Sequence, residues 1–516
     1  FYGIEIEEFP AHIAEAAMWL TDHQMNMKLS ESFGQALTRL PLKKSANITH
    51  GNALTTDWKD VIAPSKLSYM LGNPPFVGYK YQNEEQHADM SKVFHFAKGS
   101  GVLDYVTAWY WKATQYIQGT RIKVAFVSTN SITQGEQVGI LWQPMLLHYG
   151  IHIHFAHRTF KWTIDEKKAK GMKIAAVHCV IVGFANYAAE SNVLFDYEKP
   201  TSEPHRVEAK NINPYLVDAP NNFIIKRTSP ISDVPKIDYG SEPREGGYLI
   251  LSDNEKTELI SENVENLKWI RKFVSADDYL NNLSRWCLWL VDANPSEIKK
   301  SKIITNRLKQ VADFREKSLQ KAANKASDTP SLFVSIRQPT SKYLLIPIVS
   351  SERRMYIPIG YVDEKIIVSN ACFALPNATL YHFGVLTSLM HMDWMRHVCG
   401  RLKSDYRYSN TLVYNNFPWP SAPKPEQIKI IEEKAKCVLD ARAAFPSSTL
   451  ADLYDPLTMP PSLLKAHQAL DKAVDAAYRK QPFISERERI EYLFAEYQRL
   501  TAPLIGAMNA KKRRKK

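Results

Sequence analysis

Short apolar runs rich in β-branched residues alternate with helical stretches over residues 1–183. This alternation predicts a wound α/β domain. The expected strands are residues 1–6, 66–71, 122–127, 151–155 and 175–182. Between the first two, apolar residues recur at helical spacing over residues 10–27, after a proline suited to a first helical turn. The chain is therefore predicted to begin as a β-α-β unit.

The pattern changes three times further along. Residues 1–200 form the predicted first domain, and residues 201–264 are rich in Pro, Asn and Ser, which indicates a connector. Residues 265–424 mix aromatic-rich strand patterns with basic segments, including a charged, helical stretch at 294–325, and predict a mixed α+β domain. Residues 425–510 predict a helical carboxyl-terminal region, with helices at 425–444 and 462–500, before a basic tail at 511–516.

Composition places the chain among folded proteins of more than one domain. It has 516 residues, of which 45% are hydrophobic and 23% charged. No apolar run approaches the roughly 18 to 20 residues that cross a bilayer, and the start shows no signal-peptide pattern. The five cysteines lie far apart without a CxxC pair, which is typical of thiols in a reducing compartment. These features predict a cytoplasmic protein.

Charge is compatible with a nucleic-acid partner without requiring one. Lys and Arg number 66 against 54 Asp and Glu, a net charge of +12, and the tail at 511–516 supplies six of the positive charges. His152, His154 and His157 share an HxHxxH spacing, but no acidic residue or cysteine lies near them in the sequence. We therefore predict no metal site.

The most informative segment, residues 71–76, reads Leu-Gly-Asn-Pro-Pro-Phe and follows an expected strand. Its two prolines fix φ and lack amide hydrogens, so the Asn73 amide and nearby carbonyls remain as rigid acceptors. An exocyclic amine that donates both protons to such acceptors becomes a nucleophile without a formal base. Phe76 offers a flat face on which a base can stack. The alternative is an ordinary tight turn closed by prolines.

Residues 73–76 resemble the signature of amino-methyltransferases of the adenine class. The resemblance implies a Rossmann-like class I methyltransferase domain that uses S-adenosyl-L-methionine, with no metal needed for the transfer. A later aromatic residue of that family sandwiches the extruded base, and Phe160 is the match here, with Trp162 as the alternative. The catalytic residues that the resemblance implies are Asn73, Pro74, Pro75, Phe76 and Phe160.

Further cofactor residues follow from the same resemblance. Glu5, at the end of the first strand, resembles the acidic residue that receives the ribose hydroxyls of the cofactor, with Ile6 beside it. Glu7 is the alternative to Glu5. Asn73 is expected to lie next to the cofactor as well as the target base.

The loop at residues 51–54 resembles the one that contacts the cofactor's adenine. It supplies Asn52 and Ala53, and the family often has Asp where this chain has Asn52; Asp57 is a weaker candidate. Tyr105 resembles an aromatic that touches the cofactor at the start of the helix after the catalytic loop. An aromatic at this helical spacing is also typical of a core.

Beyond the catalytic fold, the resemblance narrows to the MmeI-like enzymes, single-chain restriction and modification proteins that methylate adenine. It extends over nearly the whole chain and rests on residues 338–343, 350–354, 400–409 and 414–420, which resemble the family's target-recognition domain. Arg and Lys interleaved with Tyr and amides can hold phosphates while neighbouring side chains reach base edges. The residues assigned to DNA are Arg353, Arg354, Arg401, Lys403, Tyr406, Arg407 and Tyr408.

Two features of the family are not found in the printed sequence. Its glycine-rich cofactor loop should precede the strand at residues 1–6, and its amino-terminal nuclease should precede that loop. We therefore expect a fragment whose start falls inside the cofactor-binding fold. Such a fragment is expected to bind S-adenosyl-L-methionine poorly, because the loop's close backbone approach to the ligand would be lost.

The sequence thus predicts a site-specific methyltransferase of a restriction-modification system. It would transfer a methyl group to the 6-amino group of an adenine flipped out of duplex DNA. Two alternatives stay open. The first is a methyltransferase acting on RNA or on a protein glutamine amide, and the second is a DNA-specificity module without catalysis.

Overall fold

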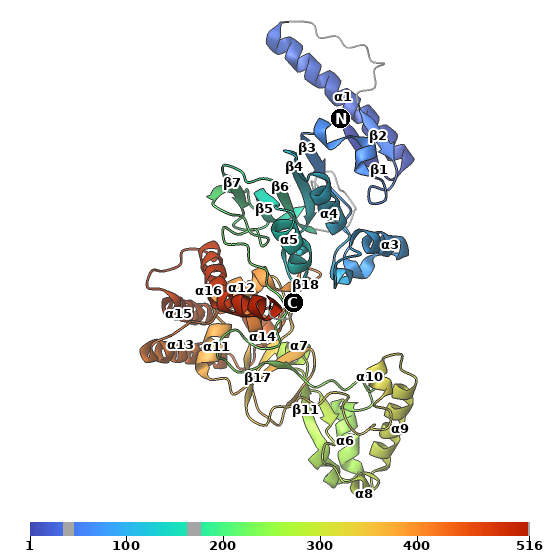
Figure 1. Ribbon diagram of the computed structural model, residues 1–516. Helices are drawn as coiled ribbons and strands as arrows, with labels where there is room; N and C mark the ends of the chain where they lie inside the picture. Colours follow the sequence, from blue (N-terminus) through green and yellow to red (C-terminus); the bar gives the residue numbers. More distant parts are fainter. Residues whose placement is uncertain (35–45, 163–176, 514–516) are drawn as a thin grey trace. The chain divides into compact units, whose positions relative to one another are not determined.

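The computed structural model describes residues 1–34, 46–162 and 177–513, with side chains described as far as residue 502. The chain divides into two compact units, Phe1–Phe223 and Ile224–Lys516, which are treated separately below (Figure 1). Among the described residues, no helix is both long and apolar enough to span a membrane.

The first unit begins with a small parallel sheet. Strands β1 (Tyr2–Glu5) and β2 (Asn47–His50) pair in parallel, and α1 (Glu8–Phe33) precedes β2. The predicted β-α-β start is confirmed, but its second strand is β2 and not the strand expected at 66–71. The pattern missed β2 because its four residues, Asn-Ile-Thr-His, form no apolar run. Helix α1 exposes large apolar side chains such as Phe9 and Phe33.

A six-stranded sheet forms the centre of the first unit. Its order is β3-β4-β6-β5-β7-β8, with β3 and β4 parallel and β6 antiparallel to both of its neighbours. The other four expected strands are present with shifted bounds. The strands are β3 (Tyr69–Gly72), β4 (Lys123–Thr129), β5 (His152–Trp162), β6 (Val177–Ala185), β7 (Asn192–Asp196) and β8 (His205–Ala209).

Aromatic side chains pack two helices against this sheet. Tyr110 of α4 lies 5.3 Å from Phe126 of β4 and 5.7 Å from Phe184 of β6, measured between ring centroids. Tyr110 also meets Trp142 of α5 at 5.6 Å, so α4 and α5 share one apolar layer over the sheet (Figure 1). The helices of this unit after α1 are α2 (Trp58–Val61), α3 (Glu84–Val93), α4 (Thr107–Tyr116) and α5 (Gln137–Leu147).

The second unit contains three further sheets. Their orders are β10-β12-β11-β16, β15-β13-β17-β9 and β14-β19-β18. Strand β13 (Tyr343–Pro347) is buried throughout and pairs antiparallel with both neighbours. The other strands are β9 (Asp238–Tyr239), β10 (Ile250–Leu251), β11 (Ile270–Val274), β12 (Trp286–Leu288), β14 (Val349–Ser350), β15 (Gly360–Val362), β16 (Ile367–Val368), β17 (Cys372–Pro376), β18 (Gly400–Leu402) and β19 (Asp405–Arg407).

Both long helical predictions in the second unit are divided by local stop signals. The stretch expected at 294–325 is three helices, because Asn294 and Ser301 each cap a new start. The stretch expected at 462–500 is two helices separated around Pro482, which cannot continue a helix. The helices are α6 (Asp253–Glu262), α7 (Ala276–Asn281), α8 (Pro295–Ile298), α9 (Lys302–Glu316), α10 (Lys321–Asn324), α11 (Leu380–Leu386), α12 (Leu389–Val398), α13 (Pro425–Ala443), α14 (Leu450–Leu453), α15 (Pro461–Tyr478) and α16 (Glu486–Arg513).

Candidate active site

A cavity of roughly 830 Å³ in the first unit is lined by β1 and β3 along their length, and it reaches past their carboxyl ends, where Ile6 and Asn73 stand. Ligands of open α/β sheets bind at the carboxyl ends of the strands, so this is the position that the fold favours for a site. Phe76 and Phe160 do not line the cavity. The predicted residues that do are Glu5, Ile6, Asn52, Ala53, Asn73, Pro74, Pro75 and Tyr105.

The carboxylate of Glu5 is held against the end of β1 by backbone donors. Its Oε1 accepts hydrogen bonds from the amides of Ile6 at 2.9 Å and Glu7 at 3.3 Å. The side chain is half-buried, and the amide of Gly51 donates to the Glu5 carbonyl at 2.8 Å. The ends of β1 and β2 are thereby joined, with one anchored carboxylate at the cavity wall.

The loop that follows β3 presents an amide to this cavity. Pro74 is buried, while Asn73 and Pro75 are exposed and Phe76 is half-buried. Among the described residues, the Asn73 side chain has no hydrogen-bond partner, so its oxygen is available to a ligand. Gly72 lies so close to the ring of Phe126 that a Cβ atom would come within 3.0 Å of it, which explains why glycine stands before Asn73.

Asp104 and Tyr105 form hydrogen bonds to the segment that follows the Asn-Pro-Pro loop. Asp104, which is only 7% exposed, accepts a hydrogen bond from the Tyr79 amide at 3.0 Å and another from the Ser131 hydroxyl. The Tyr105 amide donates to the Val77 carbonyl at 2.9 Å. Asp104 therefore ties the Asn-Pro-Pro loop to the end of β4, a role that sequence reasoning missed.

A second carboxylate, Asp89 on α3, also escaped sequence reasoning. Its Oδ2 accepts hydrogen bonds from Asn52 Nδ2 and from the Tyr105 hydroxyl, both at 2.8 Å. Asn52 Oδ1 in turn accepts the Leu54 amide at 2.8 Å. Burial and the adjacent Asp89 raise the pKa of the Tyr105 phenol above its usual range, so Tyr105 acts as a donor at neutral pH.

Lys112 on α4 holds the other side of the loop that contains Asn52. Its ammonium donates to the carbonyls of Ala53, Leu54 and Thr56 at 2.8, 3.0 and 2.7 Å. Burial lowers the pKa of Lys112 to about 8, while the nearby carboxylates oppose the change. The ammonium thus satisfies three backbone acceptors and fixes the loop that brings Ala53 to the cavity.

Phe160 lies on β5 and packs against Tyr197, with ring centroids 5.7 Å apart. Its neighbour Thr159 accepts a hydrogen bond from Asn130, just beyond β4, at 3.4 Å. Trp162 ends β5 and is 42% exposed. Their proposed contact with an extruded base stays a prediction, since the chain after Trp162 enters residues 163–176, outside the described residues.

The histidines of β5 have protein partners. His154 Nε2 lies 2.7 Å from the Tyr187 carbonyl, and His157 Nδ1 lies 2.7 Å from the Tyr197 hydroxyl. Within the described residues, no cluster of His, Cys, Asp and Glu has the arrangement of a metal site.

In the second unit, the predicted DNA residues divide by exposure. Lys403 and Arg407 are exposed on the hairpin β18–β19, and Lys403 occupies its turn with φ 57°. Arg401 is 16% exposed and its guanidinium lies 4.0 Å from the centre of the Tyr406 ring. Tyr406 and Tyr408 are buried, so their side chains pack inside the protein and stabilise the hairpin.

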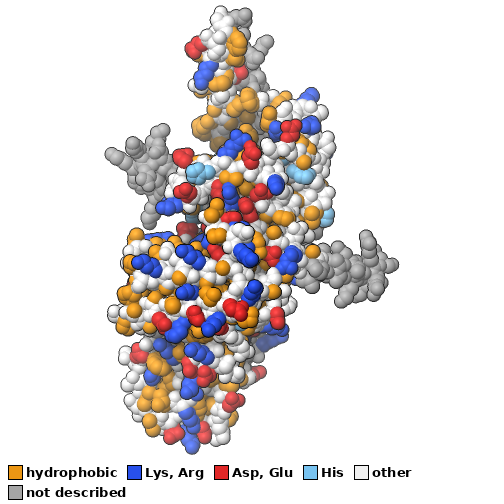
Figure 2. All heavy atoms as spheres, turned by 90° about the vertical axis from the view of Figure 1, so that its left-hand side faces the viewer, with side chains coloured by type: hydrophobic (Ala, Val, Ile, Leu, Met, Phe, Trp, Pro, Cys, Tyr) orange, Lys and Arg blue, Asp and Glu red, His pale blue; other side chains and the backbone are white. Residues whose placement is uncertain are grey.

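The other two predicted DNA-binding cations, Arg353 and Arg354, are less available to a ligand than Lys403 and Arg407. Arg353 is 59% exposed and lies 3.7 Å from Asp455, whereas burial lowers the pKa of Arg354. The block at 414–420 is structural: the Asn415 and Asn416 side chains are buried and bond to Arg227 and neighbouring carbonyls. Figure 2 shows Lys and Arg interspersed with Asp and Glu on the face that it displays, so charge alone does not single out a DNA-facing surface on that face.

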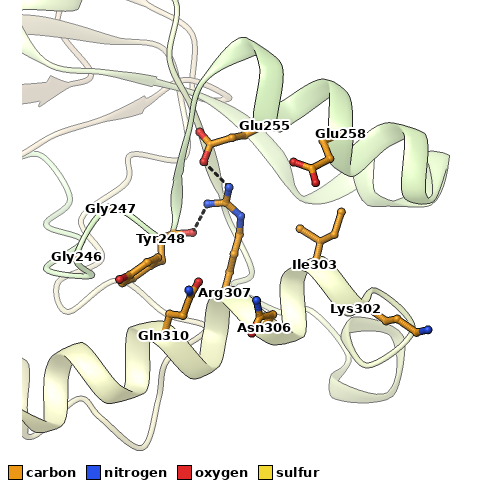
Figure 3. Close-up of a pocket in the computed structure, with 10 residues that line it drawn as sticks. All are labelled: Gly246, Gly247, Tyr248, Glu255, Glu258, Lys302, Ile303, Asn306, Arg307 and Gln310. Atoms are coloured by element: carbon orange, nitrogen blue, oxygen red, sulfur yellow. Dashed lines mark hydrogen bonds and ion pairs between the residues drawn. The ribbon is translucent and has the colours of Figure 1, made fainter.

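A second cavity, of roughly 630 Å³, lies between α6 and α9 in the second unit. Figure 3 shows Arg307 of α9 reaching to Glu255 and to the carbonyl of Tyr248, which it contacts at 3.0 Å. The Arg307 guanidinium is therefore already engaged by protein acceptors, and Lys302 also lines this cavity.

Three consecutive models of one protein family match the chain. They describe the DNA-methyltransferase domain of MmeI at residues 1–196, its target recognition domain at 218–421 and its C-terminal domain at 422–505. The chain is 40% identical over 504 residues to DNA methyltransferase A of Bacillus subtilis (strain 168), with 97% of this chain and 56% of that protein covered.

A solved structure shows the same likeness. It is the type IIL restriction-modification enzyme MmeI in complex with DNA, with a TM-score of 0.81 and 50% identity. The match covers 97% of this chain and 66% of the MmeI chain. The chain therefore spans a little over half of the Bacillus protein's length and about two thirds of MmeI's.

Proposed function

The chain belongs to the MmeI family, and we propose that it transfers a methyl group from S-adenosyl-L-methionine to the 6-amino group of adenine in duplex DNA. The observation that carries the proposal is the shared cavity. The exposed amide of Asn73 and the anchored carboxylate of Glu5 lie in its walls, Asn73 after β3 of the six-stranded sheet and Glu5 at the end of β1 of the two-stranded sheet.

The chemistry of the lining suits this cofactor. S-adenosyl-L-methionine carries a positive sulfonium and supplies the methyl group. Three carboxylates line the cavity, those of Glu5, Glu85 and Asp89, and together they favour a cationic ligand. Glu5, fixed by two amides, is placed to accept hydrogen bonds from a ribose diol.

The loop after β3 activates the target amine by accepting its protons. Asn73 Oδ1 accepts one N–H, and a carbonyl of the rigid Pro-Pro segment accepts the other. The amine lone pair is then directed at the methyl group, and the loop's acceptors need no reorganisation during transfer. Because the 6-amino group is paired inside duplex DNA, the adenine must be flipped out, at a cost of a few kcal/mol.

Duplex DNA is the substrate that the second unit supports. Residues 218–421 match the target recognition domain of MmeI, and the exposed cations on β18–β19 lie within that range. Neither a glutamine methyltransferase nor a general RNA methyltransferase needs a domain of this kind. The proposed assignment is a site-specific enzyme of a restriction-modification system.

Transfer of tritium from labelled S-adenosyl-L-methionine separates these substrate classes. The protein, expressed from its full open reading frame, is incubated with duplex DNA, structured RNA or a glutamine peptide at equal amine concentration. We expect label in the duplex alone. Preferential labelling of RNA or peptide would replace DNA as the substrate.

Phe76→Ala is expected to reduce methyl transfer moderately, by about 10- to 100-fold, because stacking on a base contributes about 1 to 3 kcal/mol. Phe76→Tyr keeps the aromatic face and should remain active. Single-turnover rates on duplexes with a paired or mismatched target adenine measure the effect. If Phe76→Ala has the parent rate on both duplexes, Phe76 packs in the core and does not stack on the base.

Asp104→Ala is expected to slow methyl transfer by about 10- to 100-fold, because the Tyr79 amide loses a buried acceptor worth about 1 to 3 kcal/mol and the Asn-Pro-Pro loop moves. Asp104→Asn retains an acceptor and should lose far less. The split between kcat and cofactor KM is the readout: a loop effect lowers kcat, whereas a parallel loss of melting temperature and both constants indicates general unfolding.

A further inference from the structure

Asn52 lines the cavity, but its hydrogen-bonding groups are already engaged by the protein. The single acceptor oxygen of Asn52 already takes the Leu54 amide at 2.8 Å. Its Nδ2 is directed at Asp89 at 2.8 Å. Asn52 therefore has no acceptor to spare for a ligand amine, and another side chain must accept the amine proton at this wall of the cavity.

Asp89 brings that carboxylate from α3 to the same place. It lines the cavity, is only 7% exposed and is bonded directly to Asn52. Both protein donors, Asn52 and the Tyr105 hydroxyl, bond to Oδ2. Within the described part of the chain, Oδ1 of Asp89 receives no hydrogen bond, so this oxygen is available to a donor on a ligand in the cavity.

The location of Asp89 relates it to one part of the cofactor. Asn52 follows β2, whose end is joined to β1 where the Gly51 amide donates to the Glu5 carbonyl. Glu5 is the proposed partner of the ribose, and the base attached to that ribose must lie nearby. The flat aromatic rings of Tyr105 and Trp109 line the same cavity, together with the apolar side chain of Ile62, and such surfaces suit a purine ring.

We propose that Asp89 accepts a hydrogen bond from the 6-amino group of the cofactor's adenine and thereby selects a 6-aminopurine over a 6-oxopurine. This inference rests on the proposed use of S-adenosyl-L-methionine. Oδ1 takes the amine proton while Asn52 and Tyr105 keep the carboxylate oriented. A 6-oxo group would set its oxygen against the carboxylate and leave Oδ1 without a donor, so the oxo analogue is rejected.

The test compares two ligands on two proteins by isothermal titration. The ligands are S-adenosyl-L-homocysteine and S-inosyl-L-homocysteine, which differ in the 6-substituent of the purine and in the N1 proton that accompanies the oxo group. The parent protein, from its full open reading frame, should prefer the adenosyl ligand by about 10- to 100-fold, the range for a hydrogen bond to a charged group. Equal affinity of the parent for both ligands would overturn the proposal without any variant.

Asp89→Asn retains an oxygen for Asn52 and Tyr105 but replaces the other oxygen with an amide nitrogen. We expect its preference for the adenosyl ligand to fall to within about threefold, because the amide donates to the oxo group and no longer attracts the amine. Glu85→Gln, on the same helix and lining the same cavity, removes an equal charge and should keep the parent preference.

The possible outcomes distinguish a failure of the proposed role of Asp89 from a failure of the proposed function. If the parent discriminates and Asp89→Asn, with an unchanged melting temperature, discriminates equally well, Asp89 does not contact the amine. If Glu85→Gln loses the preference as fully as Asp89→Asn, the selection arises from charge alone and the proposal fails. If the parent binds neither ligand, the proposed function itself fails, and the role of Asp89 fails with it.

Discussion

Replacing Asn73 by Ala is expected to lower kcat for methyl transfer by about 10²- to 10³-fold, the usual effect of removing one fixed hydrogen-bonding group that acts on the developing charge. Duplex affinity should stay within about twofold of the parent, because the amide meets the base only after flipping. The exposed position of Asn73 in the cavity wall means that the substitution removes little packing. Single-turnover methylation at saturating DNA and cofactor measures the change.

Asn73→Asp is the matched variant for this experiment. It keeps an acceptor oxygen at the same position and should retain substantial activity, whereas Ala should not. Equal rates for Asn73→Ala and the parent would remove Asn73 from the mechanism. Equal losses for Ala and Asp, with lowered melting temperatures, would assign it to loop stability.

The triple variant Arg401→Ala, Lys403→Ala, Arg407→Ala is expected to weaken duplex binding by about 10²-fold at moderate salt. The salt slope should fall by about 0.9 for each DNA phosphate that no longer has a protein cation beside it. The loss of affinity should be uniform over sequences if the residues hold phosphates. Lys403 and Arg407 are exposed on the hairpin and should account for most of it. Arg401, stacked on Tyr406, should act mainly by supporting the hairpin.

A variant of equal charge provides the control. Replacing Lys429, Lys434 and Lys436 of α13 by Ala removes three positive charges from a helix of the C-terminal region and should change duplex affinity by less than about threefold. Similar losses in both variants would mean that only net charge matters. Loss of sequence preference with an unchanged salt slope would place the hairpin residues at base edges.

The catalytic fold could be predicted from sequence because its signals are local. Apolar runs marked the strands, and the Asn-Pro-Pro-Phe segment marked the loop after β3, while β2 was missed because its four residues form no apolar run. Glu5 and Asn73 were identified from the motifs to which they belong, and both line the cavity. Their roles as ligands remain predictions.

The residues that support the site could not be found in this way. Asp89, Asp104 and Lys112 act through partners 16 to 59 positions away along the chain, and such interactions exist only once the fold brings α3 and α4 to the strand ends. No short pattern distinguishes them from other charged residues. The same limitation applies to Tyr406, an aromatic in a basic segment that the fold buries beneath its hairpin.

Identification of the methylated atom distinguishes the proposed adenine N6 transfer from every other methyl transfer to DNA. Duplex DNA containing all four bases is incubated with the protein, expressed from its full open reading frame, and isotopically labelled S-adenosyl-L-methionine, then digested to nucleosides and analysed by mass spectrometry. We expect label in N6-methyldeoxyadenosine, and almost none with Asn73→Ala. Label in a cytosine derivative, or none in any nucleoside although both cofactor and duplex bind, would contradict the proposed transfer.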